Sequence, residues 1–337
     1  MAGVACGRYA EFPMAAGLAC RICGAELHDP PFVATEGMVG TGDSFTYREC
    51  RDCGCVQIEE YPKNIGDYYP SNYYSMHVGN GSRRFERVER WLRKRRASYA
   101  LGRRDPLGHG LSKLFGVLEC YDWLRVAGLD FNSSILDVGC GNGFLLSLLQ
   151  RDGFDRLEGV DPFASDDRRR QAGFVIHRRI EDVQQRPAFV LLSHSLEHMP
   201  EQRRVLSQVR AVIDHTTWVC IRIPLANEAW RRYREHWVQL DPPRHYYLHT
   251  PRSFAELARQ TGFRIHSTRY DSTSFQFWGS EQRRMGIALT DRRSHAVALG
   301  GKGEVFSPTR MQAWEREAIE LNRSEQGDQA TFFLRVA

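Results

Sequence analysis

The chain has 337 residues, of which 42% are hydrophobic and 11% are aromatic. This composition excludes wholesale disorder, and the length suggests two domains. The net charge of +5, from 46 basic and 41 acidic residues, is too small to identify a partner. The sequence has no apolar run near the ~18 residues of a transmembrane span and no secretory signal at its start, so we expect a cytoplasmic protein.

Two C-x-x-C pairs lie near the N-terminus, at Cys20/Cys23 and Cys50/Cys53. Zn²⁺ takes four tetrahedral ligands and binds thiolates well, and each C-x-x-C turn offers two sulfurs to one side of an ion. With all four positions filled by cysteine, no site is left open for catalysis. We therefore predict a structural Zn²⁺; a redox pair or unrelated free thiols are the alternatives.

Short strands over residues 32–35 and 44–48 are expected between the two cysteine pairs, as in a zinc ribbon. Cys55 is interpreted as a bystander that could replace Cys53 by slippage. A ribbon of about 60 residues builds little core, so the metal would supply folding energy.

A tyrosine-rich segment, residues 61–75, and a basic helix, about residues 83–101, follow the ribbon. The tyrosines either pack a connecting loop or form a lid over an active site. Ten basic residues lie between Arg83 and Arg104. Our preferred interpretation is a solvated helix docked by an apolar stripe; contact with phosphate-bearing substrates or a membrane surface is the alternative.

The most informative segment is a glycine-rich turn between an expected strand at residues 135–138 and a helix that begins at Phe144. Its glycines, Gly139, Gly141 and Gly143, allow a sharp turn and close approach to a ligand. The third glycine comes one residue earlier than in a dinucleotide fingerprint. Asp137 is unsuited to a pyrophosphate, but it suits the cationic ammonium of S-adenosylmethionine.

The next expected strand, residues 156–161, ends in a carboxylate 18 residues after Gly143. In a Rossmann-like fold, an acid at this place accepts hydrogen bonds from ribose hydroxyls. We assign that role to Asp161.

Three segments together resemble the class I S-adenosylmethionine-dependent methyltransferases. These are Ile-Leu-Asp-Val-Gly-Cys-Gly-Asn-Gly at 135–143, Gly-Val-Asp-Pro at 159–162, and the fourth-strand region at 189–200, which ends in Glu-His-Met-Pro. The resemblance runs from about Ser134 to the C-terminus. It implies an α/β fold with a seven-stranded Rossmann-like sheet, mostly parallel, whose seventh strand is antiparallel. It also adds Ser193 and Asp182 to the cofactor site, although the register around Asp182 leaves a backbone group as an alternative adenine ligand.

The remaining pattern of helices and strands independently argues for an α/β fold. We expect helices over residues 202–213, 253–262 and 309–321, and strands over residues 218–224, 264–270 and 331–336. The predicted division is a zinc-ribbon-like domain at 1–60, a linker with the basic helix at 61–110, and the methyltransferase domain at 111–337.

Two histidines are candidate general bases at the carboxyl edge of the sheet, because histidine is the usual base near pH 7. His198 follows the fourth strand, and His245 lies in an Asp-Pro-Pro-Arg-His loop like those beside the substrate in relatives. His194, His236 and His249 are weaker candidates. Alternatively, Glu197 and His198 would bind a divalent ion, as the resemblance to quinone-precursor O-methyltransferases implies.

The favoured acceptor is a hydroxyl of a sugar, nucleotide-sugar or polysaccharide precursor, by analogy with related enzymes. A cysteine-rich domain before a methyltransferase core also resembles sugar C-methyltransferases of deoxysugar pathways. An RNA methyltransferase that uses the ribbon and basic helix is a further alternative. The Asn-Pro-Pro-Tyr type of motif that base methylation often uses is missing after the fourth strand. A non-catalytic binding module is the last alternative.

Overall fold

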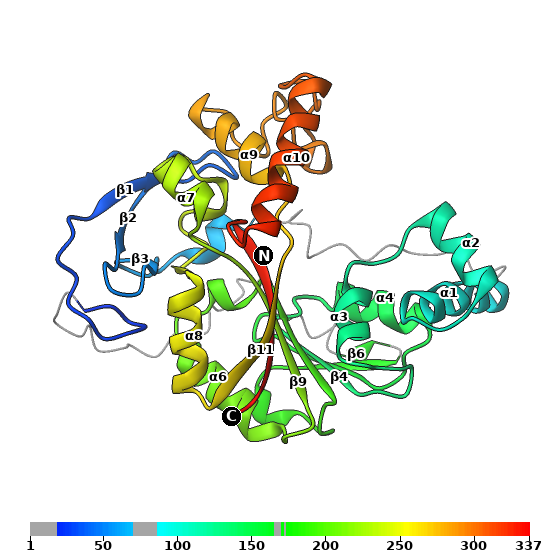
Figure 1. The fold of residues 1–337 in the computed structure, drawn as a ribbon. Helices are drawn as coiled ribbons and strands as arrows, with labels where there is room; N and C mark the ends of the chain where they lie inside the picture. The colour runs from blue at the N-terminus through cyan, green and yellow to red at the C-terminus, as the bar shows by residue number, and fades with distance from the viewer. Residues whose placement is uncertain (1–18, 70–85, 165–169, 172) are drawn as a thin grey trace, which may run out of the picture.

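The computed structural model describes residues 19–69, 86–164, 170–171 and 173–337. Its centre is an eight-stranded sheet with the order β11-β12-β9-β8-β4-β5-β7-β6 (Figure 1). The strands are β4 (Ile135–Val138), β5 (Leu157–Val160), β6 (Arg170–Gln171), β7 (Phe174–His177), β8 (Phe189–Ser193), β9 (Trp218–Pro224), β11 (Phe263–Tyr270) and β12 (Gln329–Val336).

The predicted seven-stranded methyltransferase sheet is confirmed. Strands β7, β5, β4, β8 and β9 pair in parallel, whereas β12 pairs antiparallel with both β9 and β11. The eighth strand, β6, is a two-residue antiparallel addition at the edge of β7.

Helices cover both faces of this sheet. Alternate residues of each strand point to opposite faces, and on each face they pack in a separate hydrophobic cluster. On β8, Val190 and Leu192 pack in one cluster, with α6 (Gln202–Val212) and α8 (Pro251–Gln260). Phe189 and Leu191 pack in the other, with α3 (Cys120–Val126) and α4 (Phe144–Asp152). The further helices are α1 (Glu86–Ala100), α2 (Pro106–Phe115), α7 (Glu228–Tyr233), α9 (Phe275–Arg284) and α10 (Pro308–Arg323).

Several predicted helices lie where their local signals place them. Ser307 caps α10 by accepting a hydrogen bond from the amide of Arg310, and Pro308 is its first residue. Thr250 and Ser253 form a reciprocal capping box at the start of α8. The basic helix is observed as α1; its predicted residues before Glu86 lie outside the described part of the chain.

The N-terminal cysteines lie outside the strands, next to a second, four-stranded antiparallel sheet with the order β1-β2-β3-β10. Its strands are β1 (Phe32–Thr35), β2 (Ser44–Glu49), β3 (Val56–Ile58) and β10 (Tyr247–Leu248). The first two match the predicted strands of the ribbon. The fourth strand comes from the segment just after His245, which pairs with β3 across almost 200 residues of sequence.

The N-terminal sheet is therefore not separate from the rest of the protein. Cys20, Tyr47 and Val56 belong to the same buried cluster as Leu192 of the large sheet. The division at residue 60 stays a prediction about folding units, but the small sheet crosses it. Within the described residues, no helix is long and apolar enough to cross a membrane.

Candidate active site and cysteine cluster

The glycine turn joins β4 to α4 as predicted, and each glycine has a left-handed backbone. The φ angles are +78° at Gly139, +56° at Gly141 and +75° at Gly143. A Cβ on Gly139 would lie 2.5 Å from Cβ of Ser195, and one on Gly143 would lie 2.7 Å from the Phe174 ring. Both backbone angle and space therefore require glycine at these two positions.

Asp161 lies at the end of β5, directly against this turn. Its Oδ2 accepts a hydrogen bond from the Gly141 amide at 2.8 Å, and its Oδ1 accepts one from the Phe163 amide at 2.8 Å. Burial raises the pKa of this carboxyl. Asp161 thus braces the turn besides standing where a ribose-binding acid is predicted.

Asp137 is the other carboxylate at this edge, near the end of β4. It is buried, and its burial, together with the charge of Asp161, raises its pKa to about 7. A buried acid beside a second acid fits a cationic ligand group, because an ammonium would stabilise the ionised form. The ligand group that the sequence analysis predicts next to Asp137 is of this kind: the ammonium at the methionine end of S-adenosylmethionine.

The other two predicted cofactor residues lie at the ends of neighbouring strands. Ser193 ends β8, in register with Arg222 of β9. Asp182 lies in η4 (Ile180–Asp182), the short helix after β7, and its carboxylate pairs with Arg179 at 2.8 Å. The sequence register around Asp182 is thereby fixed, while its role stays a prediction.

The two candidate bases, His198 and His245, are brought together. Their rings are 4.7 Å apart in an edge-to-face arrangement. His198 ends η5 (Leu196–His198), the turn that follows β8 and packs Ser195 against Gly139. The turn that carries His198 therefore contacts the glycine turn, at the carboxyl edge of the sheet.

Backbone carbonyls fix the orientation of both rings. Nδ1 of His198 bonds to the carbonyl oxygen of Arg244 at 2.8 Å, and Nδ1 of His245 bonds to that of Gln239 at 2.6 Å. A carbonyl only accepts hydrogen bonds, so each Nδ1 carries a proton, and in the neutral form of each ring Nε2 carries the lone pair.

Glu197 completes the group, since ligand atoms of Glu197, His198 and His245 all lie within 4.8 Å of one another. Burial alone would raise the pKa of Glu197, but a hydrogen bond from His194 and the three histidines around it hold that pKa at about 2. Its Oε2 is buried without a hydrogen-bond partner in the described part of the chain.

The weaker histidine candidates have other surroundings. His249 is buried, and its two ring nitrogens bond to Ser253 at 3.0 Å and Gln202 at 2.8 Å, which is a structural arrangement. His194 bridges Glu197 and Arg222. His236 is half exposed beside Glu235.

Sequence reasoning missed the residues that hold the His245 loop from the N-terminal side. The guanidinium of Arg244 is fully buried and donates to Asp241, to Glu36 at 2.9 Å and to the carbonyl of Tyr68 at 2.9 Å. Tyr47 donates its hydroxyl to the carbonyl of His245 at 3.0 Å. Arg244 is part of the Pro-Arg-His motif and could have been found from it. No local sequence pattern indicated that Glu36 or Tyr47 would contact this loop.

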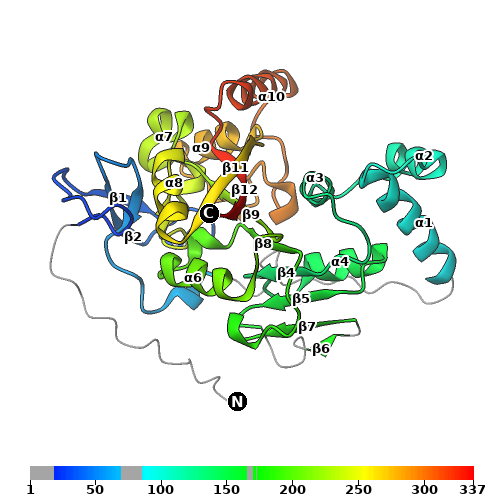
Figure 2. The same cartoon turned by 60° about the horizontal axis from the view of Figure 1, so that its bottom comes forward.

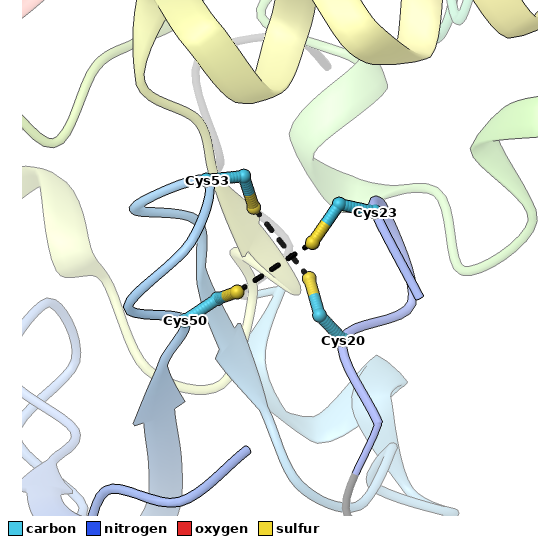
Figure 3. Close-up of side chains that lie close together, drawn as sticks. All are labelled: Cys20, Cys23, Cys50 and Cys53. Carbon is cyan, nitrogen blue, oxygen red and sulfur yellow. Dashed lines mark hydrogen bonds between the residues drawn. The ribbon is translucent and has the colours of Figure 1, made fainter. Parts of the chain in front are cut away.

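The four predicted zinc ligands come together, and Cys55 is outside the group (Figure 3). Cys20 and Cys53 sulfurs are 3.6 Å apart, as are those of Cys23 and Cys50. Four sulfurs bound tetrahedrally at about 2.3 Å would be ~3.8 Å apart, so the spacing fits a zinc ion. The hydrogen bond between Cys20 and Cys53 lowers the pKa of Cys20 to about 5 and raises the pKa of Cys53, so it favours one thiolate in this pair.

Comparison with known proteins decides the family. A family model described as a methyltransferase domain matches residues 94–268, which is more than half of the chain. The chain belongs to this family. It is an S-adenosylmethionine-dependent methyltransferase.

Solved structures resemble this methyltransferase only distantly. A proposed sarcosine dimethylglycine methyltransferase from Galdieria sulphuraria has a TM-score of 0.42 and 13% identity, over 72% of this chain and 97% of its own. An S-adenosylmethionine-dependent methyltransferase from Archaeoglobus fulgidus has a TM-score of 0.39 and 18% identity, over 69% and 100%. The mitomycin 7-O-methyltransferase MmcR has a TM-score of 0.39 and 13% identity, over 75% and 68%.

These scores carry no argument about the acceptor, and the assignment to the family rests on the domain match. Among curated proteins, none matches the chain.

The buried Asp137 predicts a pH-dependent affinity for the cofactor. With a pKa of about 7 in the free protein, the carboxylate that pairs with the ligand ammonium is mostly present at pH 8 and about one-tenth present at pH 6. Calorimetry with S-adenosylhomocysteine should therefore show affinity about tenfold weaker at pH 6 than at pH 8. Methylthioadenosine, which lacks the ammonium, is the control; an equal pH dependence for both ligands contradicts the role of Asp137.

The cysteine cluster predicts one zinc ion per chain by elemental analysis of the purified protein. Replacing Cys20 and Cys53 by serine should remove the metal and lower the melting temperature, because the metal contributes to folding of the small sheet. Cys220, a buried cysteine of β9, provides the matched control as Cys220→Ser, which should keep the metal. A wild-type protein purified without zinc-removing steps and found free of metal contradicts the assignment.

Proposed function

We propose that this methyltransferase acts on a hydroxyl of a sugar, nucleotide-sugar or polysaccharide precursor. The observation that carries the chemistry is the histidine pair, whose Nε2 atoms carry lone pairs when the rings are neutral. An acceptor that must lose a proton as it attacks needs such a base. The sugar class rests on the resemblance of the Gly-Val-Asp-Pro and Asp-Pro-Pro-Arg-His segments to methyltransferases of bacterial polysaccharide pathways. Tyr69, whose hydroxyl lies 3.2 Å from Nδ1 of His198, suits a polar acceptor.

S-adenosylmethionine supplies an electrophilic methyl group on a sulfonium. The acceptor oxygen forms the new bond to carbon while the carbon–sulfur bond breaks, and the hydroxyl proton passes to Nε2 of His198 or His245. Burial lowers the pKa of His245 to about 4, so its ring is neutral at pH 7 and its Nε2 has a lone pair. The ionised Glu197 beside the pair would stabilise the imidazolium that forms.

Three alternatives from the sequence are distinguished by their chemistry. Residues 19–60, which hold the cysteine cluster, contain three basic and eight acidic residues, a net of 3 − 8 = −5. An acidic surface does not favour RNA phosphates, so this composition argues against RNA binding by the ribbon. Carbon methylation of a sugar would use the same base but give a C–CH₃ product, which product spectroscopy separates from O–CH₃. A non-catalytic binding module would give no labelled product at all.

A second role for the group formed by Glu197, His198 and His245 is favoured by the Oε2 atom of Glu197, which is buried and has no hydrogen-bond partner among the described residues. In this candidate, Glu197 and both Nε2 atoms would hold a divalent cation that polarises the acceptor hydroxyl, and neither histidine would be free to act as the base.

Matched variants test the histidine pair. In His198→Asn and His245→Asn the amide can still donate to the backbone carbonyl, but the Nε2 lone pair is lost. We expect methyl transfer from labelled S-adenosylmethionine to a panel of nucleotide sugars to fall at least ~100-fold in one of them. Affinity for S-adenosylhomocysteine should change less than twofold.

His215→Asn, at an exposed histidine, is the control and should retain full transfer. Full methyl transfer by both His198→Asn and His245→Asn would show that neither histidine is the general base. Treatment with a chelator distinguishes the two roles of the group formed by Glu197, His198 and His245. A loss of methyl transfer that Mn²⁺ reverses, while zinc stays bound to the cysteines, supports a divalent cation at this group. Unchanged methyl transfer supports a histidine acting as the general base.

A further inference from the structure

Helices α1 and α2 form a hairpin at the opposite end of the molecule from the N-terminal sheet (Figures 1 and 2). The two helices touch closely: a Cβ on Gly108 of α2 would lie 2.2 Å from the carbonyl oxygen of Arg95 and 2.9 Å from Cβ of Tyr99. Tyr99 also packs edge-on against His109 at 4.8 Å. The pair thus behaves as one unit, which we call the α1–α2 hairpin, residues 86–117.

One face of α1 docks this hairpin on the large sheet's helical layer. Ala97 is fully buried there, and Arg93 and Arg96 lie 3.9 Å from the buried Asp152 of α4. Lys94 lies over the Phe131 ring at 4.8 Å. These contacts use the inward-facing cations and leave the outward face to be explained.

The positive charge of the protein is concentrated in this hairpin. Residues 86–117 contain nine basic and three acidic residues, a net of 9 − 3 = +6. Because the whole chain carries +5, the other residues sum to 5 − 6 = −1. Five exposed cations of the hairpin have no ion pair with the described residues: Arg87, Arg90, Lys94, Arg104 and Lys113.

Exposed apolar side chains are concentrated in the same place. Of the fourteen large hydrophobic residues exposed in the described part of the chain, seven lie between positions 88 and 117. They are Val88, Trp91, Tyr99, Leu107, Leu114, Phe115 and Val117. Leu114 is 77% exposed and Phe115 is 69% exposed, which is costly in water unless a partner covers them.

Helical spacing places these residues on defined faces. Val88, Trp91 and Tyr99 follow one stripe of α1, at i, i+3 and i+11, and Tyr99 borders the seam with α2. Leu107 and Leu114 follow one stripe of α2. Each helix therefore presents an apolar stripe. Cations flank the stripe of α1, and Lys113 lies next to Leu114 on α2.

This combination favours one kind of partner. Single-stranded nucleic acid uses cations and aromatic stacking, but it provides no place for Leu114 or Val117. An anionic membrane surface binds both the exposed cations and the exposed apolar side chains of the hairpin. Its headgroups attract Lys and Arg, and its interface accepts Trp, Phe and Leu.

We propose that the α1–α2 hairpin binds the surface of membranes that contain anionic phospholipids. The exposed cations meet the headgroups, and Trp91, Leu114 and Phe115 enter the interface. This inference is independent of the acceptor and of the histidine chemistry.

Vesicle sedimentation tests this proposal with the full chain. Binding to vesicles of phosphatidylcholine with 30% phosphatidylglycerol should exceed binding to phosphatidylcholine alone by at least tenfold, and 0.5 M NaCl should abolish the difference. The tryptophan fluorescence should shift to shorter wavelength with the anionic vesicles only, and Trp91→Phe should remove this shift. Equal binding to both vesicles, or none, overturns the proposal.

Two sets of variants locate the surface. Arg87→Glu with Arg90→Glu should weaken binding by at least ~25-fold, at about fivefold per cation, and Leu114→Ser with Phe115→Ser should weaken it at least tenfold. The controls are Arg292→Glu and Val297→Ser, an exposed cation and an exposed apolar residue outside the hairpin, which should bind as wild type.

Affinity for S-adenosylhomocysteine should stay unchanged in every variant, which shows that the fold is intact. Vesicle binding that survives both hairpin variants overturns the proposal, as does displacement from vesicles by equimolar single-stranded RNA.

Discussion

The buried guanidinium of Arg244 makes the interactions on which the position of the histidine loop depends. It lies between the carboxylates of Asp241 and Glu36, and it also donates to the carbonyl of Tyr68. Burial alone would raise the pKa of Asp241, but Arg244 holds it at about 2, so both partners are charged. Removing one partner of such a buried group costs about 3–5 kcal/mol, because the remaining charge is left uncompensated.

Glu36 is itself held in place by the N-terminal sheet. Its two carboxylate oxygens accept hydrogen bonds from the four backbone amides of Met38, Val39, Gly40 and Thr41, at 2.7 to 3.0 Å. A loop that follows β1 thus presents one fixed carboxylate to Arg244. Through that contact, the N-terminal region, the Tyr68 segment and the histidine loop form one rigid assembly.

The two halves of the active site are consequently built by different parts of the chain. The glycine turn, Asp137 and Asp161 belong to the large sheet alone, and cofactor binding should not depend on the cysteine domain. The histidine pair depends on both: Tyr47 bonds to the carbonyl of His245, the Ile58 amide bonds to Tyr246, and the Tyr246 amide bonds to Glu197. The N-terminal sheet thus contacts the loop that carries His245.

Local patterns predicted the glycine turn and the two candidate histidines, but not the contacts that hold the loop of His245 in place. The turn at 139–143 and the strand at 135–138 follow from glycine spacing and apolar runs over a dozen residues. By contrast, β10 has two residues and pairs with β3 across almost 200 positions, and a strand that short has no periodicity to detect. Glu36 was equally hidden, because a single acid becomes informative only when folding brings Arg244 to it.

Nuclear magnetic resonance of ¹⁵N-labelled histidines in Glu36→Gln tests the coupling between the cysteine domain and the histidine pair most directly. The control is Glu49→Gln, which removes an acid of the same sheet that pairs with Arg234 at the surface. We expect Glu36→Gln to shift the imidazole resonances of His198 and His245 and to leave the affinity for S-adenosylhomocysteine unchanged. We expect Glu49→Gln to change neither the resonances nor the affinity. Unshifted histidine resonances in a folded Glu36→Gln protein would contradict this coupling.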